Sequence, residues 1–247
     1  MLLQQSTWLE VEQYLTTKCG IIIPIGSTEQ HGPNGLIGTD AICPEIIAHT
    51  LAAEIGVLVA PTLNFGMAHH HLGFPGTVSL RPATLMAVIV DLVQSLALHG
   101  FRHIYFLNGH GGNVATVNAA FAEIYAQMSF TGSPTPNPLR CKLTNWWAVP
   151  AVAQLSKQLF GHSEGHHATP SEVSLSFYAH PNAVKTMTAS GTAPHGNIYD
   201  AAGFRQQFAD GRIGSDPSLA SIEAGQQLLH AATADIKQDY LSFIAAI

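Results

Sequence analysis

The stretch IIIPIGSTEQHG, residues 21–32, joins a continuous apolar run to a group of polar side chains. Three isoleucines ended by Pro24 are typical of a strand that is buried on both faces. Strands of this kind belong to parallel sheets, whose ligand sites lie beyond the carboxyl ends of the strands. We therefore expect Glu29 and His31 at the edge of a sheet that carries the functional site.

Further apolar runs predict three more strands, at residues 57–60, 103–107 and 142–146. Pro82 opens an amphipathic helix, whose apolar residues recur every three or four positions until Gly100. Alternation of strands with helices predicts an α/β protein with a largely parallel sheet and crossover helices. The other predicted helices span residues 40–54, 114–128, 173–178 and 219–245.

Two segments rich in glycine and proline predict loops. Residues 131–138 are interpreted as a turn-rich loop, and residues 179–215 as long functional or interface loops. The first segment is too short to demand a domain boundary. Because 247 residues suit one large α/β core, we predict a single domain over residues 1–247.

The composition restricts the partners that this chain can have. Only 11% of its residues are charged, whereas about a quarter is usual, so we expect a homo-oligomer that buries part of the surface. The formal charge of −6, without a run of lysine or arginine, argues against nucleic acid or an anionic membrane as a partner. A small, neutral or polar substrate fits better.

The cysteines and the apolar stretches favour a cytoplasmic protein. Cys19, Cys43 and Cys141 form no CxxC pair, so neither a disulfide framework nor a zinc-thiolate site is expected. The first residues lack a secretion signal pattern. No apolar stretch reaches the roughly 18 residues that span a bilayer, so we expect neither export nor membrane insertion.

The first polar group contains Glu29, His31 and Asp40. Histidine is abundant, with 14 copies against 10 lysines and arginines, which draws attention to such groups. Glu29 and His31 lie two residues apart, so they share one side of an extended backbone and could address neighbouring metal ions. Asp40 lies at the predicted start of a helix. A helix cap is the alternative role for that carboxylate, but its two companions favour a ligand.

The second polar group is NGHGGN, residues 108–113, between a predicted strand and a predicted helix. Its glycines permit tight backbone turns, which would present the His110 imidazole. A phosphate-binding turn is an alternative, because helix N-termini bind anions. The segment lacks the lysine and hydroxyl residue of a P-loop. A histidine with only a structural role in the turn is a further alternative.

The third polar group is EGHHATPSE, residues 164–172. Pro170 opens a predicted helix and Glu172 lies in its first turn, where capping is the ordinary role of a glutamate. Hard divalent metals need anionic oxygen ligands, borderline metals also accept imidazole, and two-metal sites combine both. The three groups together therefore fit a dinuclear metal centre.

Three consecutive histidines, residues 69–71, form a fourth group. In an extended chain their side chains would alternate, so at most His69 and His71 could face one site. We interpret this segment as lining of the pocket rather than as a source of metal ligands.

The ordered motifs PIGSTEQHG with GTD, FPGTVSL, NGHGGN and HATPSEVS resemble the signature of the creatininase (creatinine amidohydrolase) family over roughly residues 5–240. The resemblance implies a three-layer α/β/α sandwich with a largely parallel central sheet. It also implies two divalent metal ions (zinc, manganese or iron), cleavage of the C–N bond of a cyclic or linear amide, and assembly into hexamers.

The resemblance also assigns ligands. Glu29 and His110 would hold one metal ion, His31 would hold the second, and Asp40 would bridge the two. Creatinine-cleaving members of the family have a glutamate where this chain has Gly112. Glu172 would then supply the missing carboxylate, and creatinine itself becomes a doubtful substrate.

The mechanism that we expect is attack by a metal-bridging hydroxide on an amide carbonyl. His167 would carry a proton to the leaving nitrogen, Glu172 would take part beside it, and Trp146 and Trp147 would wall the pocket. Formamide hydrolysis and short-peptide amidase activity are alternatives on the same scaffold. A catalytically silent metal-binding protein and a nucleotide-binding module are alternatives of other classes.

Overall fold

A computed structural model describes residues 1–132, 138–187 and 191–245 of the chain. Its centre is a four-stranded parallel sheet in the order β2-β1-β3-β4. The strands are β1 (Gly20–Ile25), β2 (Leu58–Val59), β3 (His103–Asn108) and β4 (Arg140–Asn145). The four predicted strands are therefore confirmed, except that the last begins at Arg140 and ends before Trp146, where a short 3-10 helix starts.

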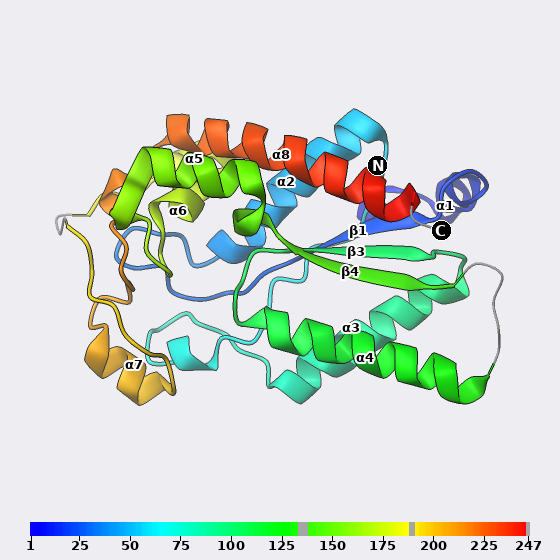
Figure 1. Ribbon diagram of the computed structural model, residues 1–247, viewed down its shortest axis with the longest axis horizontal. Coiled ribbons are helices and arrows are strands. Elements are labelled where there is room, and N and C mark those ends of the chain that lie inside the picture. The colour runs from blue at the N-terminus through cyan, green and yellow to red at the C-terminus, as the bar shows by residue number, and fades with distance from the viewer. Residues whose placement is uncertain (133–137, 188–190, 246–247) are drawn as a thin grey trace.

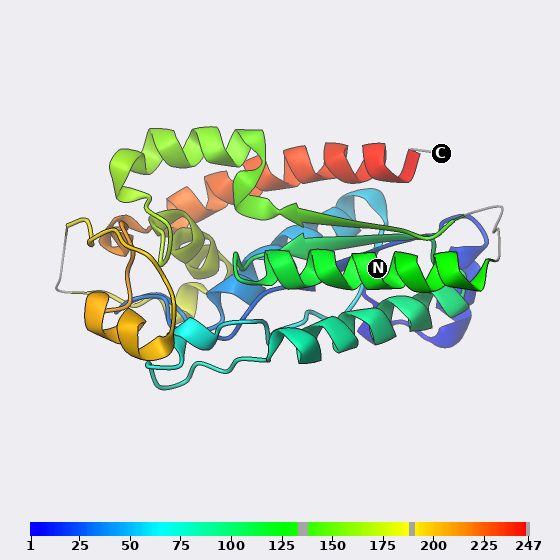
Figure 2. The same ribbon diagram turned by 60° about the horizontal axis from the view of Figure 1, so that its bottom comes forward.

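Helices cover both faces of the sheet, as Figures 1 and 2 show. One face carries α2 (Thr39–Ile55), α5 (Pro150–Phe160), α6 (Pro170–Ala179) and α8 (Ile222–Ala245). The other carries α1 (Trp8–Leu15), α3 (Pro82–Leu98) and α4 (Asn113–Thr131). The three-layer α/β/α architecture is confirmed.

Strand β1 shows how its sequence gives the layers. Alternate side chains of a strand point to opposite faces. Ile22 packs into the core under α2 and α8, while Ile21, Ile23 and Ile25 pack into the core under α3 and α4. All six residues of β1 are buried, which explains why the run is apolar without alternation.

The structure departs from the predicted elements in three places. Helices α1 and α5 lie where no element was predicted. The described residues of segment 179–215 are mostly irregular, as predicted, but include α7 (Ala201–Gln207), whose Phe204 is buried beside Phe74 and Phe208. The predicted loop at 131–138 falls largely outside the described residues.

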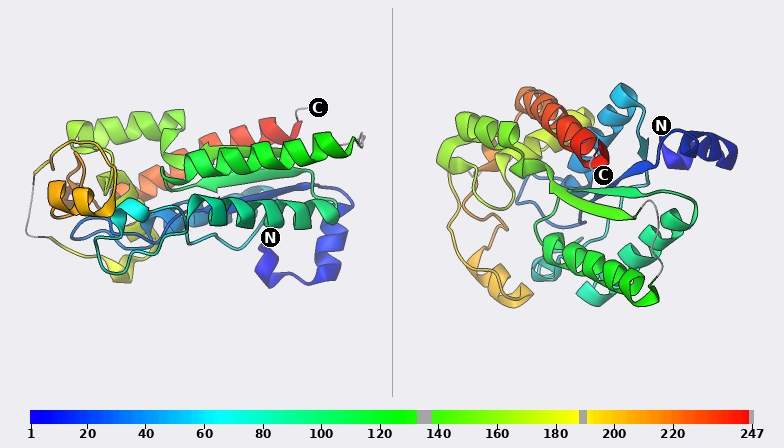
Figure 3. Two further views of the ribbon diagram at one scale, coloured as in Figure 1. Left: turned by 90° about the horizontal axis from the view of Figure 1, so that it is seen from below. Right: turned by 45° about the vertical axis from the view of Figure 1, so that its right-hand side comes forward.

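The first and last helices lie toward one end of the sheet, and the loops that follow β1 and β3 lie at the other. Helix α7 packs beside the 3-10 turn His69–His71 at one end, whereas α1 and the last turns of α8 lie toward the other (Figures 1 and 3). The carboxyl ends of β1 and β3 point toward the α7 end, so the loops that follow these strands gather there.

Candidate metal centre

The polar groups meet at the carboxyl ends of β1 and β3. From β1 the chain passes through α2 to β2 on one side, and β3 lies on the other side of β1. A change of direction of this kind leaves a crevice between neighbouring strands, where ligand sites form. Glu29 and His31 follow β1, His110 follows β3, and Asp40 lies in the first turn of α2.

Asp40 does not cap its helix. Gly38 occupies the capping position of α2, and no side-chain cap bond forms there. The Asp40 carboxylate is instead buried, and the capping alternative for this residue is wrong.

The first group of candidate ligands consists of Glu29, Asp40 and His110. His110 Nδ1 lies 3.3 Å from Glu29 Oε1 and 3.1 Å from Asp40 Oδ2. The other ring nitrogen of His110, Nε2, lies 2.9 Å from the Met67 carbonyl oxygen. Because a carbonyl only accepts, Nε2 carries the proton and Nδ1 faces the two carboxylates.

The second group of candidate ligands consists of His31, Asp40 and Glu172. His31 Nδ1 donates to the Glu29 carbonyl oxygen at 3.1 Å. His31 Nε2 therefore faces inward, at 3.0 Å from Asp40 Oδ1 and 3.8 Å from Glu172 Oε2. The two oxygens of Asp40 thus serve different groups, and main-chain carbonyls fix both imidazoles, as is common behind metal ligands.

A third arrangement brings His167 to the same place. Its Nδ1 lies 3.7 Å from Glu29 Oε1, and one ligand atom from each of Glu29, His31 and His167 lies within 4.8 Å of the others. Burial lowers the pKa of His167 well below its usual range, and the neighbouring imidazole of His71 adds to this. His167 is therefore a neutral base beside the carboxylates.

Glu29 and Asp40 fit a bound cation. Within the described part of the chain, both carboxylate oxygens of Glu29 and Oδ2 of Asp40 are buried without an aligned hydrogen bond. Buried carboxylate oxygens without aligned donors are costly. A divalent ion would satisfy all these lone pairs, and imidazole with carboxylate is a donor set that zinc and manganese accept.

The protonation of the two inward histidines shows the same need for positive charge. Burial lowers the pKa of His31, but the carboxylates of Asp40 and Glu172 outweigh it and raise the pKa to about 10. Burial likewise opposes protonation of His110, yet Glu29 and Asp40 raise its pKa to about 9. In the metal-free site, protons take the place that a cation would fill.

Glu172 has two roles at once. Its Oε1 accepts from the Thr169 main-chain nitrogen at 2.6 Å, and the Thr169 hydroxyl accepts from the Glu172 nitrogen, so the pair forms a capping box for α6. Its Oε2 faces His31. Burial raises the pKa of Glu172 to about 7, against the attraction of His31. The capping alternative therefore describes one of its oxygens only.

The three consecutive histidines form a 3-10 turn, so the expected alternation of an extended chain is wrong. His69 is exposed, and His70 and His71 are buried. His71 Nε2 lies 3.2 Å from Glu29 Oε1. Pocket lining was the role expected for this segment, and the contact of His71 with Glu29 was not expected.

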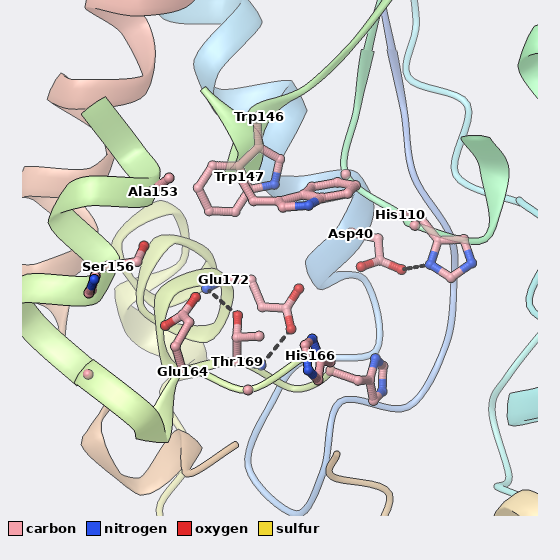
Figure 4. Close-up of a pocket in the computed structure, with 16 residues that line it drawn as sticks. Asp40, His110, Trp146, Trp147, Ala153, Ser156, Glu164, His166, Thr169 and Glu172 are labelled. Carbon is pink, nitrogen blue, oxygen red and sulfur yellow. Dashed lines mark hydrogen bonds and ion pairs between the residues drawn. The ribbon is translucent and has the colours of Figure 1, made fainter. Parts of the chain in front are cut away.

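A cavity of about 470 Å³ opens beside the cluster. Figure 4 shows Trp146 and Trp147 on one side of it, facing Asp40 and Glu172. Trp146 is also part of the core, so both alternatives for this tryptophan pair apply. The cavity is further lined by Ser156, Lys157, Glu164, His166, His167 and Thr169.

The family model for creatininase, described as creatinine amidohydrolase, matches residues 4–239. The chain belongs to the creatininase family. Of its relatives, the mycofactocin precursor peptide peptidase of Mycolicibacterium smegmatis is 40% identical over 108 residues, which cover 41% of this chain and 43% of that protein. The creatinine amidohydrolase of Pseudomonas putida is 35% identical over 113 residues, which cover 43% and 44%.

These matched segments span less than half the length of either relative. The fold similarity extends over the whole chain. A solved creatininase structure described as "Creatininase Mn" superposes with a TM-score of 0.84 at 25% identity, covering 99% of each chain. The creatininase-like fold expected from the sequence is thus confirmed.

Among the described residues, no helix combines the length and the apolar character that crossing a membrane requires.

Proposed function

We propose that this creatininase-family protein is a metal-dependent amidohydrolase that cleaves a C–N bond of a small cyclic or linear amide. The observation that carries the proposal is the shared carboxylate of Asp40. Its Oδ2 lies 3.1 Å from His110 Nδ1 and its Oδ1 lies 3.0 Å from His31 Nε2. One carboxylate between two ligand groups is the arrangement that a pair of metal ions needs.

The proposed ligands divide between two divalent ions. Glu29 and His110 hold one, His31 and Glu172 hold the other, and Asp40 holds both. Zinc suits the mixed imidazole and carboxylate donors best, with manganese or iron as alternatives. When bound, such ions lower the pKa of water toward neutrality and stabilise the developing oxyanion.

His167 and Glu172 are the proposed proton carriers. His167 is neutral and has a bare Nδ1 beside Glu29, so it accepts a proton and passes it to the leaving nitrogen. Glu172 has a pKa near neutrality in the metal-free site, which suits it to exchange a proton when its oxygen is free. Both side chains line the cavity.

The cavity bears on the substrate. At about 470 Å³ it has the size of pockets that hold drug-sized ligands, and it is larger than a small cyclic amide needs. An added Cβ at Gly112 would lie 2.4 Å from His110 Nε2, so the glutamate of creatinine-cleaving members does not fit this turn without a shift. Creatinine is therefore a weak candidate.

A short-peptide amidase is the second candidate, favoured by the same cavity volume and by the similarity to the mycofactocin precursor peptide peptidase. Formamide hydrolysis would use the same groups on a smaller substrate.

We also propose that copies of the chain associate, as a hexamer by family expectation, in the cytoplasm. The low charge content supports association, and so does the exposure of apolar side chains such as Trp8, Leu98 and Phe130. Analytical ultracentrifugation of the purified protein tests the association, and a monomer at micromolar concentration would contradict it.

The test of the proposed function is metal content per chain in protein purified without chelators, followed by removal and return of the metal. Hydrolysis of cyclic amides, formamides and short peptides is followed at each stage. Two ions per chain with restored turnover support the hydrolase, and the preferred substrate separates the two candidates. No ions and no turnover would favour the catalytically silent scaffold.

A further inference from the structure

The side chain of Gln30 lies buried between two histidines of the metal centre. Its Oε1 accepts from the Gly32 main-chain nitrogen at 2.9 Å, and its Nε2 donates to the Gly211 carbonyl oxygen at 2.9 Å. A main-chain nitrogen can only donate and a carbonyl can only accept. These two contacts therefore fix which end of the amide is oxygen and which is nitrogen, a choice that often stays open for glutamine.

The amide nitrogen has one hydrogen left after Gly211. Two ring nitrogens lie near it, His71 Nδ1 at 2.9 Å and His167 Nε2 at 2.8 Å. His167 Nε2 also lies 2.9 Å from the carbonyl oxygen of Gln30 itself, which it can satisfy only as a donor. The remaining hydrogen of Gln30 therefore goes to His71 Nδ1.

This assignment places the protons of both rings. His71 accepts at Nδ1, so its proton is on Nε2, which lies 3.2 Å from Glu29 Oε1 in a close contact that is not aligned as a hydrogen bond. His167 donates from Nε2, so its Nδ1 is bare and faces the metal centre. The opposite tautomer of His71 would aim a lone pair at the Glu29 carboxylate and an N–H at the amide nitrogen of Gln30.

His71 has little freedom to escape this arrangement. Its side chain is 1% exposed. Its ring stacks on the His167 ring, with ring centres 4.2 Å apart. It also makes a T-shaped contact with the Phe204 ring, with ring centres 4.6 Å apart. A ring so enclosed changes its contact with Glu29 by moving its proton rather than by turning away.

We propose that Gln30 is a positioning residue, which holds His71 in the tautomer that presents an N–H to Glu29. This inference rests on the proposed function insofar as Glu29 is a metal ligand. Partners behind a ligand typically change metal affinity by about 10–100-fold when they are removed. Gln30 thus acts on metal binding through His71, without touching the ion or the substrate.

The first test needs no substitution. Long-range proton–nitrogen NMR spectra of ¹⁵N-histidine-labelled protein distinguish protonated from bare ring nitrogens, in the zinc-loaded and in the metal-free protein. We expect both His71 and His167 to carry the proton on Nε2, in the zinc-loaded and in the metal-free protein. A His71 proton on Nδ1 in the zinc-loaded protein would overturn the proposal.

The second test uses Gln30→Glu, whose carboxylate accepts but cannot donate to His71. We expect the His71 proton to move to Nδ1 and zinc affinity, measured by competition with a chelator, to fall by about 10–100-fold. Gln226→Glu, an exposed position of α8, adds the same charge away from the site and should leave zinc affinity unchanged. Unchanged zinc affinity in Gln30→Glu would also overturn the proposal.

A double-mutant cycle separates positioning from added charge. In a His71→Gln background no imidazole is left to reorient, so Gln30→Glu should change zinc affinity by no more than about twofold further. A full second loss would show that the new charge acts directly and would overturn the route through His71. If the proposed function fails, the unsubstituted protein will show no zinc binding or no turnover. The NMR test in the metal-free protein still decides the tautomer of His71 in that case.

Discussion

Gly109 brings the turn after β3 so close to Asp40 that an added Cβ atom would lie 1.9 Å from the Asp40 carbonyl oxygen. Gly26, after β1, approaches the same oxygen, and its added Cβ would lie 2.2 Å away. Pro44, four residues after Asp40 in α2, has no N–H to donate to that carbonyl. The segments that follow β1 and β3 therefore both pack directly against the Asp40 carbonyl group. This packing places the Asp40 carboxylate between His31 and His110.

Gly109→Ala should destabilise the protein and misplace Asp40. The new methyl group would meet the Asp40 backbone and the rigid ring of Pro44, with no flexible side chain to displace, so we expect a loss of about 1–3 kcal/mol or more in the free energy of unfolding. The bound metal per chain should fall as well, because Asp40 serves both ligand groups. Urea denaturation and elemental analysis measure the two effects.

Gly111→Ala is the matched control for this substitution, two residues along the same turn. An added Cβ there meets nothing within 4 Å, and the residue has no positive φ. We expect stability and metal content close to those of the unsubstituted protein. Equal losses in both variants would show that the turn as a whole, rather than the contact with Asp40, is sensitive.

The sheet could be predicted because its strands are buried on both faces, which leaves continuous apolar runs in the sequence. Helix α3 was also predictable from Pro82 and Gly100. Helices α1 and α5 carry signals that the prediction did not use. Thr7 and Glu10 form a capping box at the start of α1, and Pro150 and Gly161 bracket α5.

The candidate site was predictable where a motif follows a strand, as for Glu29, His31 and His110, because parallel strands end at one edge. The contacts of His71 and Gln30 were not. They depend on a 3-10 turn at residues 69–71 and on the carbonyl of Gly211, which comes from a distant loop. Local sequence does not determine a geometry that packing against α7 decides.

Asp40→Asn should weaken metal binding at both positions. The amide keeps the shape of the side chain but loses its charge and replaces one ligand oxygen by nitrogen. Since loss of an outer partner alone costs about 10–100-fold in affinity, loss of this shared ligand should cost more. Metal titration followed by elemental analysis counts the ions, and retention of both would remove Asp40 as a shared ligand.

Asp239→Asn is a matched control for the loss of a partly buried carboxylate. Asp239 accepts from Tyr105 at 2.7 Å and Thr144 at 2.9 Å, and pairs with Lys142, outside the metal centre. We expect lower stability and unchanged metal content. Loss of metal in this variant would mean that general destabilisation, rather than ligand loss, empties the site.

Glu172→Gln should remove one ion and spare the other. Glutamine can still complete the capping box with Thr169, so α6 should keep its start. The group of Glu29, Asp40 and His110 does not include Glu172 and should retain its ion. Metal content near one per chain, with turnover reduced by at least about 100-fold as expected for loss of a general acid–base group, is the predicted result. Two retained ions would exclude Glu172 as a ligand.

The metal-free protein should lose stability as the pH rises above neutrality. Burial lowers the pKa values of His31 and His110, but the surrounding carboxylates outweigh it and raise them from 6.5 to about 10 and about 9. A raised pKa means that the folded state favours the proton, so this stabilisation is complete below pH 6.5 and disappears as the pH passes through 9 to 10. We expect the melting temperature of chelator-treated protein to fall across this interval.

The zinc-loaded protein is the control. There the ions replace the protons, so the melting temperature should fall much less over the same pH interval. Calorimetric titration in buffers of different ionisation enthalpy should also detect proton release on zinc binding. A melting temperature that falls equally with and without zinc would place the titrating groups elsewhere in the protein.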